Sequence, residues 1–342
     1  MRVLISLVCI GAVSICHADP LFESHELLNV RLEAPLQEMA RDRSAEPEER
    51  PGLFSYTEAD GTSRQFSIKV QPRGKNRRIR EVCKFPPLWL NLKKGDVKGT
   101  LFKKQNKLKL VTQCASLSSK SKKVADYLWL EYVAYRIFNK ITDQSFRVRP
   151  LAISYMDTKN QREFEQPGFL IEHKDRLAHR LDTSVFELNS IHPRELQVEA
   201  SQLVELFQYM LGNTDFSLIR GPKGDRCCHN LVLMGETPEF LPIPYDLDIT
   251  GFVNRPGSAP AEGVGITRVT QRVYRGFCRE PALMQQSVAR YLDERDAIMA
   301  LIEQQAGLSD SSKAKAVKYL NQFYDTLDKP KKFERQIVKR CR

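Results

Sequence analysis

Short runs that alternate between apolar and polar residues dominate the chain from about residue 66 to residue 172. Strict alternation is typical of strands with one buried face, and polar turns between such strands favour antiparallel pairing. The five runs lie at residues 66–70, 88–92, 108–111, 147–155 and 168–172. They predict an antiparallel sheet.

Between the third and fourth of these runs, residues 121–141 carry the period of an amphipathic helix. Val124, Leu128, Tyr135 and Phe138 are spaced so that they share one helical face. Glu131 falls on the same face, where a carboxylate needs a cation or a route to water. Two interpretations stay open: a partly exposed glutamate, or an ion pair between this helix and a lysine of the sheet.

The second half of the chain has a mainly helical pattern. Helices are predicted over residues 196–211, which run directly into Gly212, and over residues 283–305 and 311–326. Residues 19–60 differ from both halves, because much of this segment is polar, acidic and interrupted by proline. That composition favours an N-terminal arm outside the core.

The first eighteen residues have the pattern of a signal peptide. Arg2 precedes an apolar run, and Ala18 supplies a small residue at a plausible cleavage site. The run is shorter than the ~20 apolar residues that span a bilayer, and no later run approaches that length. We therefore expect cleavage after Ala18, a periplasmic or secreted protein, and no membrane-spanning segment.

Export permits disulfides among the six cysteines that follow the signal peptide. Cys83 and Cys114 form the favoured pair, because each lies at the edge of a strand-like run. Cys227 and Cys228 are adjacent and are expected not to bond to each other, because neighbouring residues fit disulfide geometry poorly. The cysteines show no zinc-finger spacing.

The chain is basic, with a formal net charge of +11. Much of the excess lies in residues 73–94 and 103–123. Such charge suits nucleotide phosphates, an acidic protein or an anionic polymer of the cell envelope. Nucleic acid is the poorest of these partners for an exported protein, so we expect none.

An ordered set of polar residues carries the candidate chemistry. Asp215 follows a predicted helix, Asn230 opens a strand-like run, and Asp246 and Asp248 follow the next run. Phosphoryl-transfer enzymes place a proton-accepting Asp, a metal-binding Asn and a metal-binding Asp in this order. The order predicts Asp215 as the catalytic base, and Asn230, Asp246 and Asp248 as ligands of Mg²⁺.

Three segments carry this set: Gly-Asn-Thr-Asp at 212–215, His-Asn at 229–230, and Pro-Tyr-Asp-Leu-Asp-Ile-Thr-Gly at 244–251. They resemble the spore-coat CotH-like kinases and, more broadly, atypical kinases of the HipA type, in particular an exported bacterial branch. Val-Gln-Pro-Arg-Gly-Lys at 70–75 and Lys-Phe-Pro-Pro at 84–87 are similar to that family's Arg-Gly loop and the lysine after it. The resemblance covers about residues 66–254.

The resemblance implies an α+β, two-lobed protein-kinase-like fold. An antiparallel sheet and one helix would form the small lobe at residues 61–175, and a mainly helical large lobe would occupy residues 176–342. The implied cofactors are ATP and Mg²⁺ or Mn²⁺. The implied substrate is a serine or threonine of an envelope or secreted protein, with transfer of AMP as a variant.

The resemblance also implies a set of residues that bind the nucleotide. Arg73 belongs to the Arg-Gly loop, and Glu131 would pair with the phosphate-binding lysine. Lys109 and Lys84 both fit that lysine, with Lys107 third.

A catalytically inactive scaffold of the same fold is the alternative. The loop around Arg73 is poor in glycine, and Asp215 and Asn230 stand fifteen residues apart, farther than in most kinase loops. Such a scaffold would use its basic residues to bind an acidic partner or an anionic envelope polymer. Convergence of Asp215, Asn230 and Asp246 in space would favour the enzyme.

Overall fold

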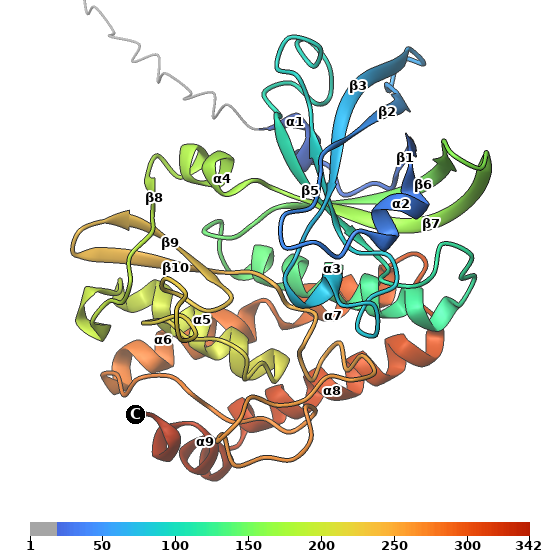
Figure 1. Ribbon diagram of the computed structural model, residues 1–342. Helices are drawn as coiled ribbons and strands as arrows, with labels where there is room; N and C mark the ends of the chain where they lie inside the picture. Colours follow the sequence, from blue (N-terminus) through green and yellow to red (C-terminus); the bar gives the residue numbers. More distant parts are fainter. Residues whose placement is uncertain (1–18) are drawn as a thin grey trace, which may run out of the picture.

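The computed structural model describes residues 19–342, and its main feature is a closed barrel of seven strands in the order β1-β2-β3-β4-β5-β7-β6 (Figure 1). The strands are β1 (Leu28–Ala34), β2 (Arg50–Thr57), β3 (Ser63–Pro72), β4 (Leu88–Asn91), β5 (Lys107–Thr112), β6 (Val148–Asp157) and β7 (Arg162–Ile171). All neighbours are antiparallel except β1 and β6. The signal-peptide prediction falls on residues 1–18, outside the described part.

The closed barrel shows that the expected two-lobed protein-kinase-like fold is wrong. The five expected strands are present as β3 to β7, but residues 19–60, expected as an arm, supply β1 and β2. Leu28, Val30 and Leu32 alternate with polar residues and are buried. This strand pattern was hidden by the polar, proline-rich segment that follows it. The parallel pairing of β1 with β6, from Leu28 opposite Leu151 onward, closes the sheet.

Aromatic side chains fill the barrel. The ring of Phe102, from the β4–β5 connection, lies 5.2 Å from that of Phe54 and 4.9 Å from that of Tyr56, measured between centroids. All three residues are buried. Two short helices, α1 (Pro20–Glu23) and α2 (Leu36–Arg41), add apolar residues to the same core.

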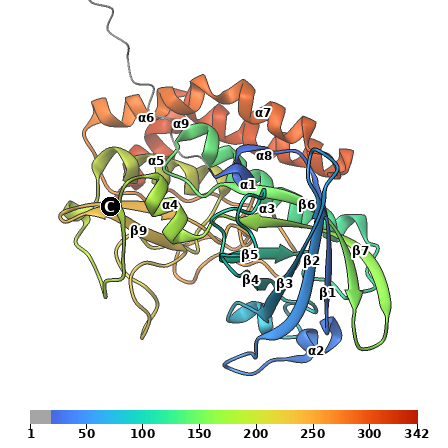
Figure 2. The same ribbon diagram turned by 90° about the horizontal axis from the view of Figure 1, so that it is seen from above.

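A long helix, α3 (Lys122–Ile141), joins the barrel to the rest of the molecule. It confirms the helix predicted at residues 121–141. It contacts β6 and β7 on one side, and α5 (Val198–Leu211) and α7 (Arg295–Gln304) on the other. Figure 2 shows the barrel and the helical region side by side, with α3 between them.

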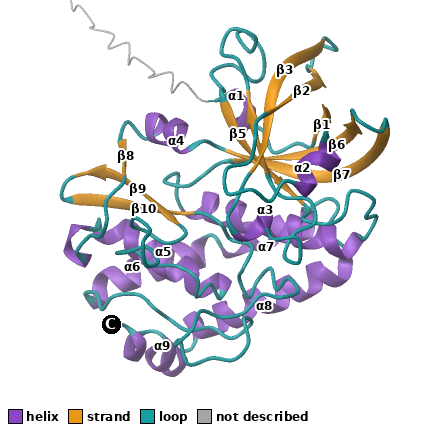
Figure 3. Ribbon diagram, viewed as in Figure 1, coloured by secondary structure: helices purple, strands orange, loops and turns teal. Residues whose placement is uncertain are grey.

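The helical region also contains α4 (Lys174–Arg180), α6 (Pro281–Asp293), α8 (Asp310–Asp328) and α9 (Pro330–Gln336). A three-stranded sheet of β8 (Ser184–Phe186), β9 (Leu231–Glu236) and β10 (Glu239–Pro244) lies beside these helices (Figure 3). Short 3-10 helices are η1 (Asn76–Arg78), η2 (Pro193–Glu195) and η3 (Val338–Arg340). The single helix expected at residues 283–305 is two helices, α6 and α7, because the chain leaves the helical conformation at Glu294.

Three disulfides join the six described cysteines. Cys83–Cys114 confirms the favoured pair, and Cys278 bonds to Cys341. The expectation for Cys227 and Cys228 was wrong. The chain turns sharply enough at this point to place their Cα atoms 3.0 Å apart, and the two are bonded to each other.

Disulfides persist in oxidising compartments, which agrees with an extracellular or periplasmic location. From residue 19 to the C-terminus, the structure contains no helix that is long and apolar enough to cross a bilayer.

Gly212 ends α5 and sets the path of the chain into the candidate site. Its φ of +62° is left-handed, and a Cβ there would lie 2.1 Å from the hydroxyl oxygen of Tyr319. We expect Gly212→Ala to lower the free energy of unfolding by about 2–4 kcal/mol, from backbone strain and overpacking together.

Chemical denaturation would measure this loss, with Gly61→Ala as the matched control. Gly61 also has a positive φ, of +86°, but open space surrounds its missing Cβ. This control should therefore lose only the backbone part, about 1–2 kcal/mol. Equal losses for both variants would show that the contact with Tyr319 is unimportant.

Candidate functional site

A cavity of about 790 Å³ lies between the barrel and the helical region. Its walls come from η1 and the loop before it, from β5, from the loop between Asp215 and Asn230, and from the segment after β10. The sequence-predicted residues that line it are Arg73, Lys109, Asp215, Asn230, Asp246 and Asp248. Residues that are far apart in the chain thus meet in one place.

Asp215 stands just beyond the end of α5. The side chain of Asn213 accepts a hydrogen bond from the backbone nitrogen of Asp215 at 2.9 Å. Asn213 is itself buried, and its amide nitrogen donates to Gln208 of α5 at 2.8 Å. The buried asparagine therefore fixes the start of the loop and holds Asp215 at the cavity wall.

The fifteen-residue step from Asp215 to Asn230 folds back on itself. Ser217 and His229 exchange two backbone hydrogen bonds of 3.1 Å, which close the base of the intervening loop. As a result, the amide nitrogen of Asn230 donates to the backbone oxygen of Asp215 at 2.7 Å and to its carboxylate at 3.1 Å. The long spacing does not keep the two residues apart.

His229 is a site residue that the sequence analysis did not assign. Its Nε2 lies 2.7 Å from a carboxylate oxygen of Asp215. The hydrogen bond with Asp215 raises the pKa of His229 above its ordinary value, although partial burial opposes the shift. The position of His229 next to Asn230 in the chain is the signal that could have pointed to it.

Asn230 and Asp246 lie on neighbouring segments of the chain that line the same cavity. The backbone nitrogen of Tyr245 donates to the backbone oxygen of Asn230 at 3.1 Å, and the hydroxyl of Tyr135 accepts from the backbone nitrogen of Asp246 at 2.9 Å. Asn230 has a φ of +55° and Asp246 a φ of +58°. Left-handed conformations of residues other than glycine cost energy and concentrate at functional sites.

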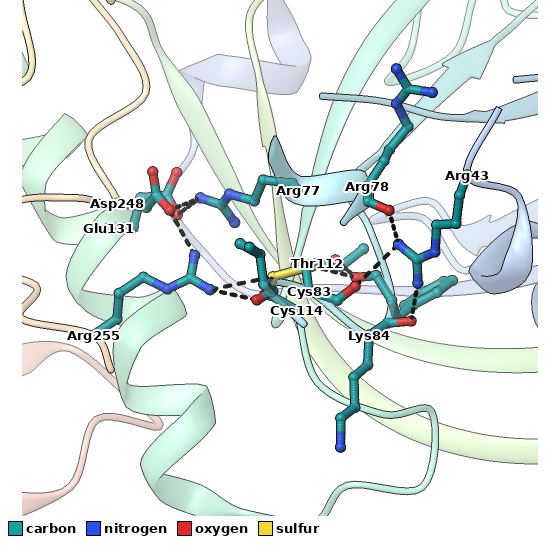
Figure 4. Close-up of a disulfide and its surroundings, with 12 residues drawn as sticks. Arg43, Arg77, Arg78, Cys83, Lys84, Thr112, Cys114, Glu131, Asp248 and Arg255 are labelled. Atoms are coloured by element: carbon teal, nitrogen blue, oxygen red, sulfur yellow. Dashed lines mark hydrogen bonds and ion pairs between the residues drawn. A yellow bond between two sulfur atoms is a disulfide. The ribbon is translucent and has the colours of Figure 1, made fainter. Parts of the chain in front are cut away.

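Asp248 belongs to a buried ionic cluster with Arg77, Arg255 and Glu131. Both arginines contact its carboxylate at 2.7 Å, and Arg77 also contacts Glu131 at 3.2 Å. Figure 4 shows the four side chains pointing toward one another. Burial alone would raise the pKa of Asp248, but the two arginines outweigh it and hold the pKa below its ordinary value.

Glu131 therefore pairs with an arginine of η1, and no lysine contacts it in the described chain at ion-pair distance. Burial raises its pKa to about 7, because repulsion from Asp248 adds to the loss of water and Arg77 only partly offsets both. Glu131 does form an ion pair, but the expected lysine of the sheet is wrong: the cation is Arg77 of η1. Sequence spacing did not reveal Arg77, because the residue lies in a short 3-10 turn without a periodic pattern.

Arg255 connects this cluster to a disulfide. It donates to the backbone oxygen of Val82 at 3.2 Å and lies 3.5 Å from the sulfur of Cys114. The Cys83–Cys114 bond thus holds the segment that carries Val82 against Arg255 (Figure 4).

Lys109 points from β5 into the cavity, among aromatic rings. Its ammonium lies 5.0 Å from the ring centroid of Tyr245 and 5.7 Å from that of Trp89. Arg73 lies over the same Trp89 ring at 5.4 Å, and Lys107 at 4.7 Å. Burial, together with repulsion from Arg73, lowers the pKa of Lys109 to about 7.

Lys84 lies elsewhere. It is exposed beside the Cys83–Cys114 disulfide, and its side chain points away from Glu131 and Asp248 (Figure 4). It borders a neighbouring cavity and not the one that contains Asp215 and Asp246. Of the three lysines ranked for nucleotide binding, only Lys109 lines the cavity with the other candidate residues.

Asp246 is open to the cavity, although protein surrounds it. Loss of bulk water and repulsion from Asp248 raise its pKa to about 6. The cavity thus offers an acidic side around Asp215 and Asp246 and a basic side around Arg73 and Lys109. That division suits a ligand that is itself anionic and is bound together with a cation.

The chain matches no protein-family model and, at a significant level, no curated protein.

The donor atoms present fit a magnesium ion in part. Asp246 and the amide oxygen of Asn230 are hard oxygen donors on one cavity wall, and that amide oxygen accepts no hydrogen bond from residues 19–342. Mg²⁺ is usually held by one or two carboxylates together with substrate phosphates and water. Within this range the structure has no group of three or more His, Cys, Asp and Glu poised for a metal. Asp248 fits less well than we expected, because two arginines occupy its carboxylate.

Proposed function

We propose that this cavity transfers a phosphoryl group from ATP to a serine or threonine hydroxyl of an envelope or secreted protein. The observation that carries the proposal is the convergence of Asp215, Asn230, Asp246 and Lys109 on one cavity. A proton acceptor, oxygen donors for a metal and a cation for phosphates are the parts that phosphoryl transfer requires. The local segments that resemble CotH-like kinases support this chemistry, whereas the fold does not.

Asp215 takes the role of proton acceptor. Its carboxylate is held by His229 at 2.7 Å and by Asn230 at 3.1 Å. In the step we propose, the hydroxyl oxygen of the acceptor forms a bond to the γ-phosphorus, and the bond from that phosphorus to the bridging oxygen of ADP breaks. The hydroxyl proton passes to Asp215, and ADP leaves with the bonding electrons.

Lys109 and Arg73 take the phosphates of the nucleotide. Both line the cavity and lie near Trp89, on the wall formed by the barrel. A lysine with a lowered pKa regains its charge when an anion approaches, so phosphate binding and protonation of Lys109 support each other.

Asp246 and Asn230 would hold a divalent cation, which supplies charge neutralisation at the transferring phosphates when bound. Asp248 has a different task in this proposal. Through Arg77 and Arg255 it fixes the segment that carries Asp246, so it positions the metal ligand and does not coordinate the metal.

Lys109→Met tests the nucleotide site directly. In wild type, affinity for ATP should fall as pH rises above about 7, because the pKa of free Lys109 is lowered to about 7 and binding then requires proton uptake. Lys109→Met should bind ATP at least tenfold more weakly and lose this pH dependence.

Calorimetry between pH 6 and pH 9, with and without Mg²⁺, would measure these affinities, and Lys107→Met is the matched control. Lys107 lies on the same strand but does not line the cavity. The mass of any reaction product would separate phosphate transfer from AMP transfer. Absence of metal-dependent ATP binding in wild type would refute the proposed function and favour a non-catalytic binding protein.

A further inference from the structure

A second cavity, of about 360 Å³, meets the first at Asp215 and His229. It opens on the helical side of these residues, and its lining includes Arg220, Arg275 and Arg342. Lys109 and Asp246, on the nucleotide side, do not line it. Asp215 is therefore reached from two sides, one with the candidate nucleotide residues and one with three arginines.

The side chain of Arg275 is held in place by contacts to neutral groups, which leave its charge available. Arg275 donates to the backbone oxygens of Thr214 and Phe216, the residues on either side of Asp215. Its guanidinium lies 5.2 Å from the ring centroid of Phe216. These contacts tie Arg275 to the loop that carries the proposed base.

Arg342 reaches the same cavity from the segment that follows η3. Its backbone nitrogen donates to Gly276 at 3.1 Å, and its backbone oxygen accepts from Cys278 at 3.2 Å. The Cys278–Cys341 disulfide fixes this pairing beside Arg275. Arg220 completes the set from the loop after Asp215, where its backbone nitrogen donates to the hydroxyl of Ser217 at 3.3 Å.

Arginines outnumber carboxylates in the lining of this cavity. Among residues 19–342, neither Arg220, Arg275 nor Arg342 forms an ion pair with an aspartate or glutamate, and Asp215 is the only acidic residue in the lining. The pKa of Arg275 is lowered by burial and, after that, by repulsion from Arg342. Like charges gathered at one cavity create a positive potential that attracts an anionic ligand.

We propose that this second cavity binds an anionic group of the acceptor, a carboxylate or a phosphate, placed close to the hydroxyl that receives the phosphoryl group. Guanidinium groups bind both anions through paired, charge-assisted hydrogen bonds. The inference rests on the proposed function and adds its substrate class. The acceptor is a serine or threonine with an acidic or phosphorylated neighbour, and it enters on the side of Asp215 opposite Lys109.

Peptide binding in the absence of nucleotide tests this site separately from catalysis. The probes are three serine peptides of equal length that carry glutamate, phosphoserine or glutamine beside the serine. We expect both acidic peptides to bind more tightly than the glutamine peptide, and the preference to weaken as salt is raised. Whichever acidic peptide binds more tightly shows whether the site prefers a carboxylate or a phosphate.

Arg220→Gln should weaken binding of the acidic peptides about tenfold, the loss typical of one charge-assisted hydrogen bond. Binding of the glutamine peptide and of ATP should not change. Arg275→Gln should act in the same direction, with circular dichroism to confirm folding, because this arginine also holds backbone oxygens. Arg162→Gln, an exposed arginine at the start of β7, is the matched control and should behave as wild type.

Equal affinity for the acidic and neutral peptides, or unchanged binding in Arg220→Gln, would overturn the proposal. The outcome is distinguishable from failure of the proposed function. A protein that selects acidic peptides through Arg220 but never binds ATP would retain this anion site and lose the assignment as a phosphotransferase.

Discussion

Asp215→Asn is expected to reduce phosphoryl transfer by about 10²–10⁴-fold, the usual contribution of a positioned proton acceptor. An amide has nearly the shape of the carboxylate, but it cannot take the hydroxyl proton. Its single oxygen can accept only one of the two hydrogen bonds that His229 and Asn230 form with the separate oxygens of Asp215. Affinity for ATP should stay close to wild type, because Asp215 lies on the wall opposite Lys109. Transfer would be measured by mass spectrometry of the acceptor peptide.

His229 supplies a second readout for the same variant. The hydrogen bond with Asp215 raises the pKa of this histidine in wild type. Loss of the negative charge in Asp215→Asn should therefore lower the pKa of His229, which an NMR titration of its ring protons would detect. This shift is expected whether or not the protein is active, so it shows that the pair forms in solution.

Two further variants serve as comparisons for Asp215→Asn. Asp246→Asn should weaken metal-dependent ATP binding as well as transfer, because it removes the one free carboxylate of the proposed metal site. Asp225→Asn should change neither, since Asp225 is exposed at the cavity mouth, where it pairs with Lys75. Full transfer activity in Asp215→Asn would exclude Asp215 as the base.

The local elements of this protein could be predicted from its sequence because their signals are local. Alternation marked the strands β3 to β7, and helical spacing marked α3 and α5. The Cys83–Cys114 bond followed from the same reasoning, because both residues lie near strand-like runs of the sequence. Each of these inferences depended on residues within a few positions of one another.

Closure of the barrel could not be read in this way. It depends on parallel pairing between β1 and β6, which are separated by more than a hundred residues. An alternating pattern indicates that one face of a strand is buried, but it does not indicate which other strand pairs with that strand. The resemblance to kinases implied an open sheet without β1. The predicted fold was taken from that resemblance, so it lacked the closed barrel.

The candidate site shows the same division. The order of Asp215, Asn230 and Asp246 suggested convergence, and the structure brings all three to one cavity. The residues that contact them, His229, Arg77 and Arg255, were not predicted. These three reach the site through the folding of the chain, and no regular spacing in the sequence marks them. Glu131 is the informative case: its place on an apolar face required a cation, but only the structure identified Arg77.

Arg77→Met is expected to lower the free energy of unfolding by about 3 kcal/mol or more, because breaking a buried ion pair leaves uncompensated charge. Only 14% of the Arg77 side chain is exposed, and it serves the carboxylates of both Glu131 and Asp248. Methionine approximates its length but offers no charge. Arg255 still contacts Asp248 in the variant, so Glu131 becomes the isolated group.

The loss of stability in Arg77→Met should depend on pH, and titration of Glu131 determines whether it grows or shrinks as pH rises. Burial already raises the pKa of this residue from its ordinary 4.5 to about 7 in the folded protein, and removal of Arg77 should raise it further. The folded state then binds a proton that the unfolded state releases. Stability of the variant should therefore be closest to wild type near pH 4.5 and should fall as pH rises through 7 and beyond.

Chemical denaturation of Arg77→Met at pH 5 and pH 8 measures both effects, and Arg78→Met provides the matched control. Arg78 is the next residue of η1, but among residues 19–342 its guanidinium bonds only to the backbone oxygens of Gly74 and Ala45. Arg78→Met should therefore lower the free energy of unfolding much less than Arg77→Met and should add no pH dependence. If the two variants lost equal stability at pH 8, the ionic cluster would not be what holds Asp248 and the neighbouring Asp246 at the cavity. We expect Arg77→Met to lose more stability than Arg78→Met, because Arg77 contacts the carboxylates of both Glu131 and Asp248.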